Sequence, residues 1–254
     1  MKIQLIRNAT LLLDYAGTHI LIDPDFGVKE SRPSFTGKSQ NPMVDLPLSI
    51  ERILDGVELV IVSHLHSDHF DEVAQESVPK TLPLICQPVN EEFIRDEGFE
   101  QVTPLADTME WGKFRITRTD GHHGLGEVGE IMKPVSGFVF QADGEPTLYW
   151  AGDTVNCDEV RAAIATFKPD VIVTHSCGAK WPDKADVRHL IVMDAAQTID
   201  ICRLAAKSVI VATHMEALDH ATVSRTDLRS EANEAGVSKT QLRIPSDGGI
   251  IEFP

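Results

Sequence analysis

Several features that define other classes of protein are scarce in this chain. It has only four cysteines, and no two form a Cys-x-x-Cys pair, which excludes a zinc ribbon or a thioredoxin-type motif. No apolar run approaches the ~20 residues that span a bilayer. The first residues also lack the apolar core and cleavage site of a signal peptide. We therefore expect buried, isolated thiols, no membrane association and a cytoplasmic location.

Positive charge is also in short supply. Lys and Arg total 23 against 39 Asp and Glu, which gives a formal charge of −16. A surface this acidic repels phosphate backbones at long range, so we expect no nucleic-acid partner. It does not exclude an anionic small molecule, because bound metal ions reverse the local charge. The expected partner is a small-molecule substrate, and a homo-oligomer is compatible with the sequence.

The pattern of apolar residues predicts mixed strands and helices in both halves of the chain. No linker, repeat or low-complexity tract divides residues 1–254, so we expect a single domain. Ser49 and Asn90 are the expected caps of their helices. Strands are predicted at 2–6, 9–14, 19–22, 58–62, 114–119, 135–141, 147–151, 170–174, 208–213, 242–244 and 250–253. Helices are predicted at 49–55, 71–78, 90–97, 158–167, 193–206 and 225–235.

Four of the predicted strands run directly into a potential metal ligand. LVIVSH ends at His64, DVIVTH at His175, VIVATH at His214 and TLYWAGD at Asp153. Uninterrupted Val and Ile are typical of strands covered on both faces. In layered α/β folds the carboxyl ends of such strands open into ligand sites. These side chains are therefore candidates for one common site.

The segment SHLHSDHFD is the strongest chemical motif. It places His64, His66, Asp68 and His69 in an H-x-H-x-D-H arrangement directly after a strand. Imidazole nitrogen and carboxylate oxygen are good ligands for zinc and similar ions. His64 and His66 lie two apart on extended chain and point to the same side. A turn then redirects Asp68 and His69, which predicts two neighbouring metal sites and not merely a His-rich loop.

H-x-H-x-D-H after an apolar strand resembles the signature of the metallo-β-lactamase superfamily. Asp23 in ILIDP, the pair His122 and His123, Asp153 in AGDT and His214 in VIVATH follow in the order that the superfamily shows. The resemblance implies a four-layer αβ/βα sandwich, with two mixed sheets packed face to face and helices outside. ILIDP, PSFTG with NP, and GEVG with VSGFVF are similar to the bacterial branch that includes L-ascorbate-6-phosphate lactonase. Asn8 departs from that branch, where His is expected.

The resemblance also implies a ligand set for two divalent ions, with zinc or manganese expected first and iron as a further option. One site would use His64, His66 and His123, the other Asp68, His69 and His214, with Asp153 bridging both. His123 begins the His-x-x-Gly form of this branch, whereas a T-P-G-H alignment would select His122 instead. The histidine that is not a ligand, His122 in the first case, would face the substrate or cap a turn. Asp23 would accept a hydrogen bond from a ligand histidine and fix its tautomer.

The expected activity is that of a metal-dependent hydrolase. Two ions ~3.5–4 Å apart activate a hydroxide, which would attack a lactone, ester, amide or phosphoester. Asp68 is the expected catalytic residue, orienting the nucleophilic water and accepting its proton. The alternatives are a nuclease or phosphodiesterase of the same fold, against which the acidic balance argues, and a metal-binding redox or sensing protein.

Four further side chains are open to two interpretations. His175 ends a strand and is placed either at the rim of the site or in the core as a structural histidine. Glu216 and His220 have spacing that suits one face of a helix, either along the pocket wall or in solvent. Lys180, with Trp181 and Arg188, lies in a loop that could meet an anionic substrate but is better interpreted as surface.

Overall fold

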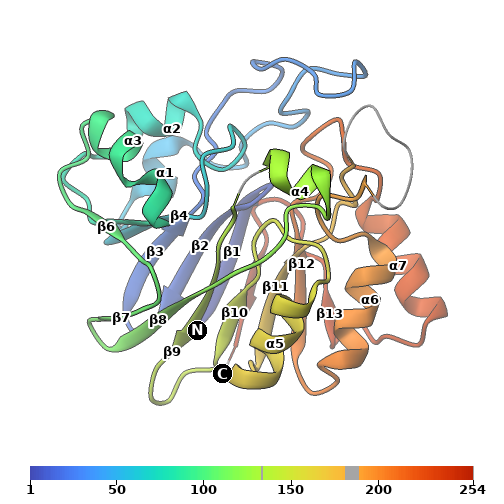
Figure 1. Cartoon of the computed structure of the whole chain (residues 1–254). Helices are drawn as coiled ribbons and strands as arrows, with labels where there is room; N and C mark the ends of the chain where they lie inside the picture. The colour runs from blue at the N-terminus through green and yellow to red at the C-terminus, as the bar shows by residue number, and fades with distance from the viewer. Residues whose placement is uncertain (133, 181–188, 254) are drawn as a thin grey trace.

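The structure is a computed structural model that describes residues 1–132, 134–180 and 189–253. Two seven-stranded sheets form its centre (Figure 1). The first has the order β14-β1-β2-β3-β4-β5-β6 and the second β13-β12-β11-β10-β9-β8-β7. The strands of the first sheet are β1 (Lys2–Arg7), β2 (Thr10–Tyr15), β3 (Thr18–Ile22), β4 (Leu59–Val62), β5 (Leu84–Cys86), β6 (Val102–Pro104) and β14 (Ile250–Glu252).

The second sheet has the same mixed character as the first. Its strands are β7 (Thr108–Trp111), β8 (Phe114–Thr119), β9 (Gly137–Gln141), β10 (Leu148–Trp150), β11 (Val171–His175), β12 (Val209–Thr213) and β13 (Leu242–Arg243). In each sheet, antiparallel strands at one side give way to parallel strands at the other, β3 to β6 and β10 to β13. The two mixed sheets expected from the sequence are confirmed.

Helices cover the outer face of each sheet and complete the four layers (Figure 1). Apolar residues of α1 (Ile50–Leu54), α2 (Glu72–Ser77) and α3 (Glu91–Asp96) pack on the first sheet. Those of α5 (Asp158–Phe167), α6 (Ala195–Leu204) and α7 (Arg225–Glu234) pack on the second. A third cluster of apolar side chains fills the space between the sheets. In it, the rings of Phe138 and Trp150 stack with their centroids 5.8 Å apart. Among the described residues, no helix has the length and apolar character needed to cross a membrane.

The structure also contains elements that the sequence analysis did not predict. These are β5, β6 and β7, the short helix α4 (Glu127–Met132) and the 3₁₀ turn Pro88–Asn90. Each of the three strands has only three or four residues. A run this short carries too little periodicity to distinguish a strand from a loop.

Three local predictions were wrong. The side chains of Ser49 and Asn90 make no capping hydrogen bond, whereas those of Asp71, Asp194 and Ser224 do cap their helices. Residues 214–220 form no helix, because His214 and Glu216 have φ angles of +60° and +64°. An α-helix cannot continue through residues in the left-handed region.

Candidate metal centre

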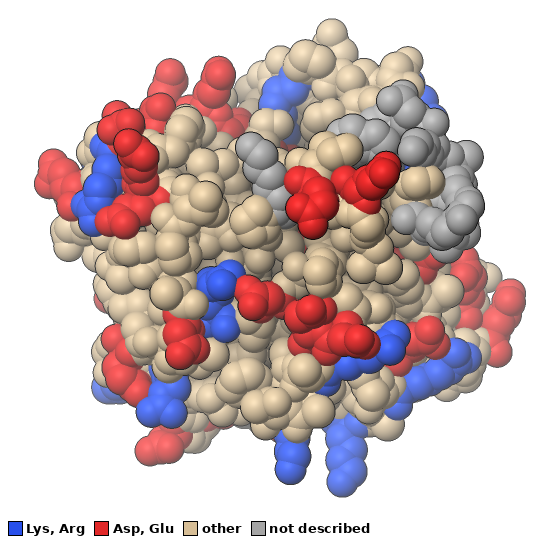
Figure 2. Space-filling view, viewed as in Figure 1, with Lys and Arg blue, Asp and Glu red and all other residues tan. Residues whose placement is uncertain are grey.

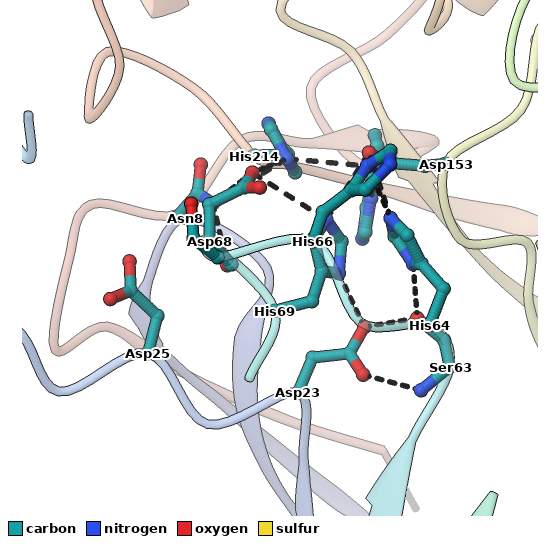
Figure 3. A network of polar contacts seen from close by, with 12 residues as sticks. Asn8, Asp23, Asp25, Ser63, His64, His66, Asp68, His69, Asp153 and His214 are labelled. Carbon is teal, nitrogen blue, oxygen red and sulfur yellow. Dashed lines mark hydrogen bonds and ion pairs between the residues drawn. The ribbon is translucent and has the colours of Figure 1, made fainter. Parts of the chain in front are cut away.

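The carboxyl ends of strands from both sheets meet at one edge of the sandwich, around Asp153 (Figure 3). Asp153 Oδ2 lies 3.1 Å from His69 Nε2, 3.5 Å from His123 Nε2 and 4.0 Å from His64 Nε2. Asp153 Oδ1 lies 3.6 Å from His214 Nε2. One buried carboxylate thus faces four imidazoles that come from segments up to 150 residues apart in sequence.

The first half of the site comes from one short segment after β4. His64 and His66 follow the end of β4, and their facing nitrogens, His64 Nε2 and His66 Nδ1, are 3.0 Å apart. The backbone then turns, with His69 N donating to His66 O at 2.9 Å. Asp71 ends the turn by capping α2. This turn brings Asp68 Oδ2 within 3.0 Å of His214 Nε2, on the other side of the centre.

Asp23 fixes the orientation of this segment from behind. Its carboxylate accepts hydrogen bonds from His69 Nδ1 at 2.7 Å and from the amide and hydroxyl of Ser63, both at 2.7 Å. Because the Ser63 hydroxyl proton is directed at Asp23, Ser63 Oγ accepts from His64 Nδ1 at 2.9 Å. Both ring Nδ1 atoms therefore carry protons, and both Nε2 lone pairs face the centre.

The second half of the site comes from separate loops. His123 Nδ1 donates to Ile191 O at 2.7 Å, which leaves its Nε2 lone pair directed at Asp153. His175 Nδ1 donates to Asp153 Oδ1 at 2.5 Å, and its ring packs edge-on against Trp150. Asp153 follows Gly152, whose φ is +70° and whose position leaves no space for a Cβ atom against Ser136 O. The tight turn of AGD therefore requires glycine.

Three residues of the site have a strained backbone. Asn8, Asp23 and His214 have φ angles of +57°, +48° and +60°. Non-glycine residues in this region cost of order 1–3 kcal/mol and cluster at functional sites. Asn8 is held by both halves: its Nδ2 donates to Asp68 Oδ2 at 3.2 Å, and its carbonyl accepts from His214 N at 2.8 Å.

The electrostatics of the cluster favour cations. Burial raises the pKa of Asp68 and Asp153, but the surrounding imidazoles outweigh it and hold both pKa values well below the usual range. Burial and neighbouring imidazoles lower the pKa of His64, and burial lowers that of His123 to about 4. Burial also lowers the pKa of His69 and His214, but nearby carboxylates outweigh it and raise both.

These donors fit divalent metal ions. Two groups of ligand atoms each lie within 4.8 Å of one another: His64, His66 and His123 in one, and His69, Asp153, His175 and His214 in the other. Buried carboxylates need a compensating charge, and imidazole lone pairs converge on them here. Mixed nitrogen and oxygen donors of this kind suit zinc, manganese or iron.

A cavity of about 330 Å³ opens beside the cluster. Its metal-facing side consists of His66, Asp68, His123 and Asp153. Its other described walls are mainly apolar, with Phe35, Leu65, Met132 and Ile191 joined by Ser67, Lys180 and His220. The volume is at the small end of the range for ligand pockets, which is the size expected for a small substrate.

The structure separates the remaining candidates. His122 is about half exposed and pairs with Glu159 at 3.2 Å, away from the cluster that contains His123. Glu216 pairs with Arg225 at the start of α7 and does not line the cavity. His175 lies fully buried against Asp153, not at the rim. Lys180 lines the cavity, whereas Trp181 and Arg188 lie outside the described residues.

Sequence reasoning missed several residues of the site. Ser63 links Asp23 to His64, and Cys177 Sγ lies 3.5 Å from His214 Nδ1. The apolar cavity walls come from four separate segments. Ser63 sits between the strand and the first histidine, so its position was a usable signal. The wall residues carried no such signal, because Phe35, Leu65 and Ile191 lie in loops and Met132 ends a helix of only six residues, so they show no periodic pattern.

Comparison with known proteins places this site in a family. The model of the beta-lactamase superfamily domain matches residues 18–215. UPF0173 protein YddR from Bacillus subtilis (strain 168) is 36% identical over 100% of both chains. The chain belongs to the UPF0173 family of the beta-lactamase superfamily. Other UPF0173 proteins are named metal-dependent hydrolases, among them one from Xanthobacter autotrophicus that is 26% identical over 68% of this chain and 70% of its own length.

Two solved structures are similar to this UPF0173 chain over its whole length. One is described as a possible metal-dependent hydrolase from Veillonella parvula DSM 2008, with a TM-score of 0.95, 31% identity and coverage of 100% and 99%. The other is an isothiocyanate hydrolase from Delia radicum gut bacteria, with a TM-score of 0.92, 35% identity and the same coverage. The chain is thus an enzyme of the metal-dependent hydrolase class, with the metallo-β-lactamase fold.

Proposed function

We propose that this UPF0173 protein hydrolyses a small, uncharged molecule at an electrophilic carbon, using two divalent ions held on either side of Asp153. The position of Asp153 carries the proposal, because its two oxygens face ring nitrogens from both donor groups. His64, His66 and His123 would hold one ion, and Asp68, His69 and His214 the other. Zinc and manganese are the first metals to test, and iron the next.

When bound, divalent ions would supply two kinds of chemistry here: a water with a pKa nearer neutrality and polarisation of the bond to be cleaved. Asp68 would supply the acid–base group: it lines the cavity, and its Oδ2 accepts from Asn8 Nδ2 at 3.2 Å. That hydrogen bond fixes the carboxylate so that Oδ2 can take a proton from water. Asp23 and Ile191 O keep the ligand histidines in one tautomer throughout.

The charge and polarity of the residues that line the cavity indicate the class of substrate. Among the described lining residues, Lys180 is the only lysine or arginine, and the other walls away from the metal-facing side are four apolar side chains joined by Ser67 and His220. A phosphoester, or a phosphorylated lactone of the kind that the lactonase-like branch suggests, would need more cationic contacts. Neutral lactones, esters, amides and isothiocyanates fit better. Isothiocyanates are included because a 35% identical relative is named for that activity.

Isothiocyanate hydrolysis requires only water as a second reactant. The water oxygen bonds to the central carbon, both water protons go to nitrogen, and the C–N bond breaks. The products are a primary amine and carbonyl sulfide.

The nuclease alternative receives little support from the surface. On the face drawn in Figure 2, Asp and Glu side chains lie in several groups, with Lys and Arg interspersed along the lower part. No continuous basic stripe crosses the described residues on that face. With a charge of −16, we expect negligible affinity for duplex DNA at physiological salt.

A substrate panel tests the proposal on zinc- and manganese-loaded protein. Benzyl isothiocyanate, phenyl acetate, γ-butyrolactone and acetanilide represent neutral substrates, and bis(p-nitrophenyl) phosphate represents phosphodiesters. We expect turnover of at least one neutral substrate, lost in Asp68→Asn. Turnover of the phosphodiester alone would overturn the proposal and favour a phosphodiesterase.

A further inference from the structure

The PSFTG segment, which the metal centre does not use, forms one wall of the cavity. Phe35 of this segment is 41% exposed, and its ring lies edge-on to the ring of His220, with centroids 5.0 Å apart. Both side chains line the cavity beside the metal-facing residues. The long 26–48 stretch runs over the same edge of the sandwich as α4 (Figure 1).

One carboxylate, that of Asp219, holds this wall in place. Asp219 Oδ1 accepts from the backbone amide of Phe35 at 3.0 Å, and Oδ2 accepts from the amide of Thr36 at 3.0 Å and its hydroxyl at 2.6 Å. The Ser34 hydroxyl also donates to Oδ2. Two consecutive backbone amides and two hydroxyls thus converge on a single buried side chain.

Asn41 closes the segment from its other end. Its Nδ2 donates to Asp219 Oδ1 at 2.9 Å, and its Oδ1 accepts from the Asp219 amide at 2.9 Å. Asp219 directly precedes His220, so the same residue sets the position of both rings. Although burial raises the pKa of Asp219, hydrogen bonds from Ser34, Thr36 and Asn41 outweigh it and hold that pKa well below its usual range.

The start of the 26–48 stretch is tied to the metal-binding turn. Arg7 Nη2 donates to the carbonyls of Asp25 and Gly27, at 3.0 and 2.9 Å. Arg32 Nη2 donates to Asp25 Oδ2 at 2.9 Å, and Arg32 Nη1 donates to the carbonyl of Ser67. The stretch is therefore anchored on both sides of Phe35, which makes a defined wall and not a loose loop.

We propose that Phe35 and His220 form a specificity wall that binds an uncharged, flat apolar group of the substrate, and that Asp219 is the positioning residue of that wall. Leu65, Met132 and Ile191 supply the apolar surface of the other described walls. A flat group between them would contact the Phe35 ring while its reactive carbon reaches the metal-facing side. The inference rests on the proposed function, because it assigns the substrate of the same site.

Two hydroxamates that differ by one phenyl ring isolate the wall from the metal centre. Acetohydroxamic acid and phenylacetohydroxamic acid share the same metal-chelating head, and only the second has a ring to place against Phe35. Calorimetric titration of zinc-loaded protein gives both Kd values and their ratio. Because turnover is not measured, the result does not depend on finding the natural substrate.

We expect wild-type protein to bind the phenyl probe more tightly than the acetyl probe. Phe35→Ala should reduce that preference about three- to tenfold, the size of a lost aromatic contact, without changing acetohydroxamate binding. Phe93→Ala is the matched control, since Phe93 is also 41% exposed but lies on α3 and not at the cavity. Asp219→Asn should lower the preference as Phe35→Ala does, with metal content retained.

The outcomes separate the two proposals. Binding of acetohydroxamate with an equal preference in wild type and Phe35→Ala would overturn the wall and leave the metal centre intact. An unchanged preference in a folded, metal-bound Asp219→Asn would overturn the positioning role. No binding of either hydroxamate to protein that has been supplied with zinc would overturn the proposed function and the wall with it.

Discussion

In the first sheet, a single run of six residues after β4 carries four of the proposed site residues, His64, His66, Asp68 and His69. The second sheet provides its share one at a time, from a loop before α4 and from the ends of β10, β11 and β12: His123, Asp153, His175 and His214. A local motif can be formed by one turn of the chain. The residues from the second sheet, which we call the dispersed half, come together only after parallel strands have aligned their ends. Their geometry therefore depends on packing of the whole sheet.

Asp153→Ala should affect both halves of the site and have the largest effect, because Asp153 faces donors from both halves. We expect metal content to fall from about two ions per chain to well below one, with hydrolysis lost in parallel. Elemental analysis of the purified variant measures this. Asp120→Ala, which changes a carboxylate that is 70% exposed, is the control. A variant that kept wild-type metal would show that Asp153 is no ligand.

The adjacent histidines of the dispersed half allow a sharper test. His123 faces Asp153 and His66, whereas His122 pairs with exposed Glu159. We expect His123→Ala to lose metal and activity together, and His122→Ala to retain both within about twofold, as surface changes do. Parallel metal analysis decides between them. Metal loss confined to His122→Ala would reverse the assignment.

A smaller effect distinguishes the residues that support each half. Asp23 orients His69 and Ser63 in the local half, and His175 contacts Asp153 in the dispersed half. Asp23→Asn and His175→Gln should each lower metal affinity about 10–100-fold, the usual cost of losing a partner behind a ligand. Competition with a chelator gives the affinities. Loss in His175→Gln as large as in Asp153→Ala would make His175 a ligand itself.

The smallest effect concerns the thiols, for which the two halves should behave alike. Burial raises the pKa of Cys86 behind the first sheet to about 12 and that of Cys202 on α6 to about 11. Both thiols are therefore protonated at pH 8, and all four cysteines are buried and unpaired. Ellman's reagent should modify well under one thiol per native chain and all four after unfolding. Rapid modification of the native protein would indicate that one layer opens readily.

The sequence was sufficient for what depends on local pattern. The apolar strands that run into His64, Asp153, His175 and His214 predicted that these side chains share one site, and the structure brings them together around Asp153. That they bind metal stays a prediction. The buried thiols were also predicted correctly. Short strands such as β5 were not predicted, because three residues that are all buried show no periodicity.

What the sequence could not provide depends on contacts between distant segments. Asp219 and Phe35 are 184 residues apart. In the sequence alone, nothing connects this acidic residue to this exposed aromatic residue. Glu216 and His220 do not share the face of a helix, for a related reason. His214 is turned towards the centre by a left-handed φ, which a pattern of residue types does not reveal.

The last strand of the chain completes the first sheet and not the second. β14 pairs with β1, matching Lys2 with Glu252 and Gln4 with Ile250. Until residues 250–252 join the sheet, the outer edge of β1 therefore has unpaired amides and carbonyls. Open edges of this kind recruit strands from other molecules. A variant that lacks residues 250–252 would thus be more prone to aggregate than the wild-type protein.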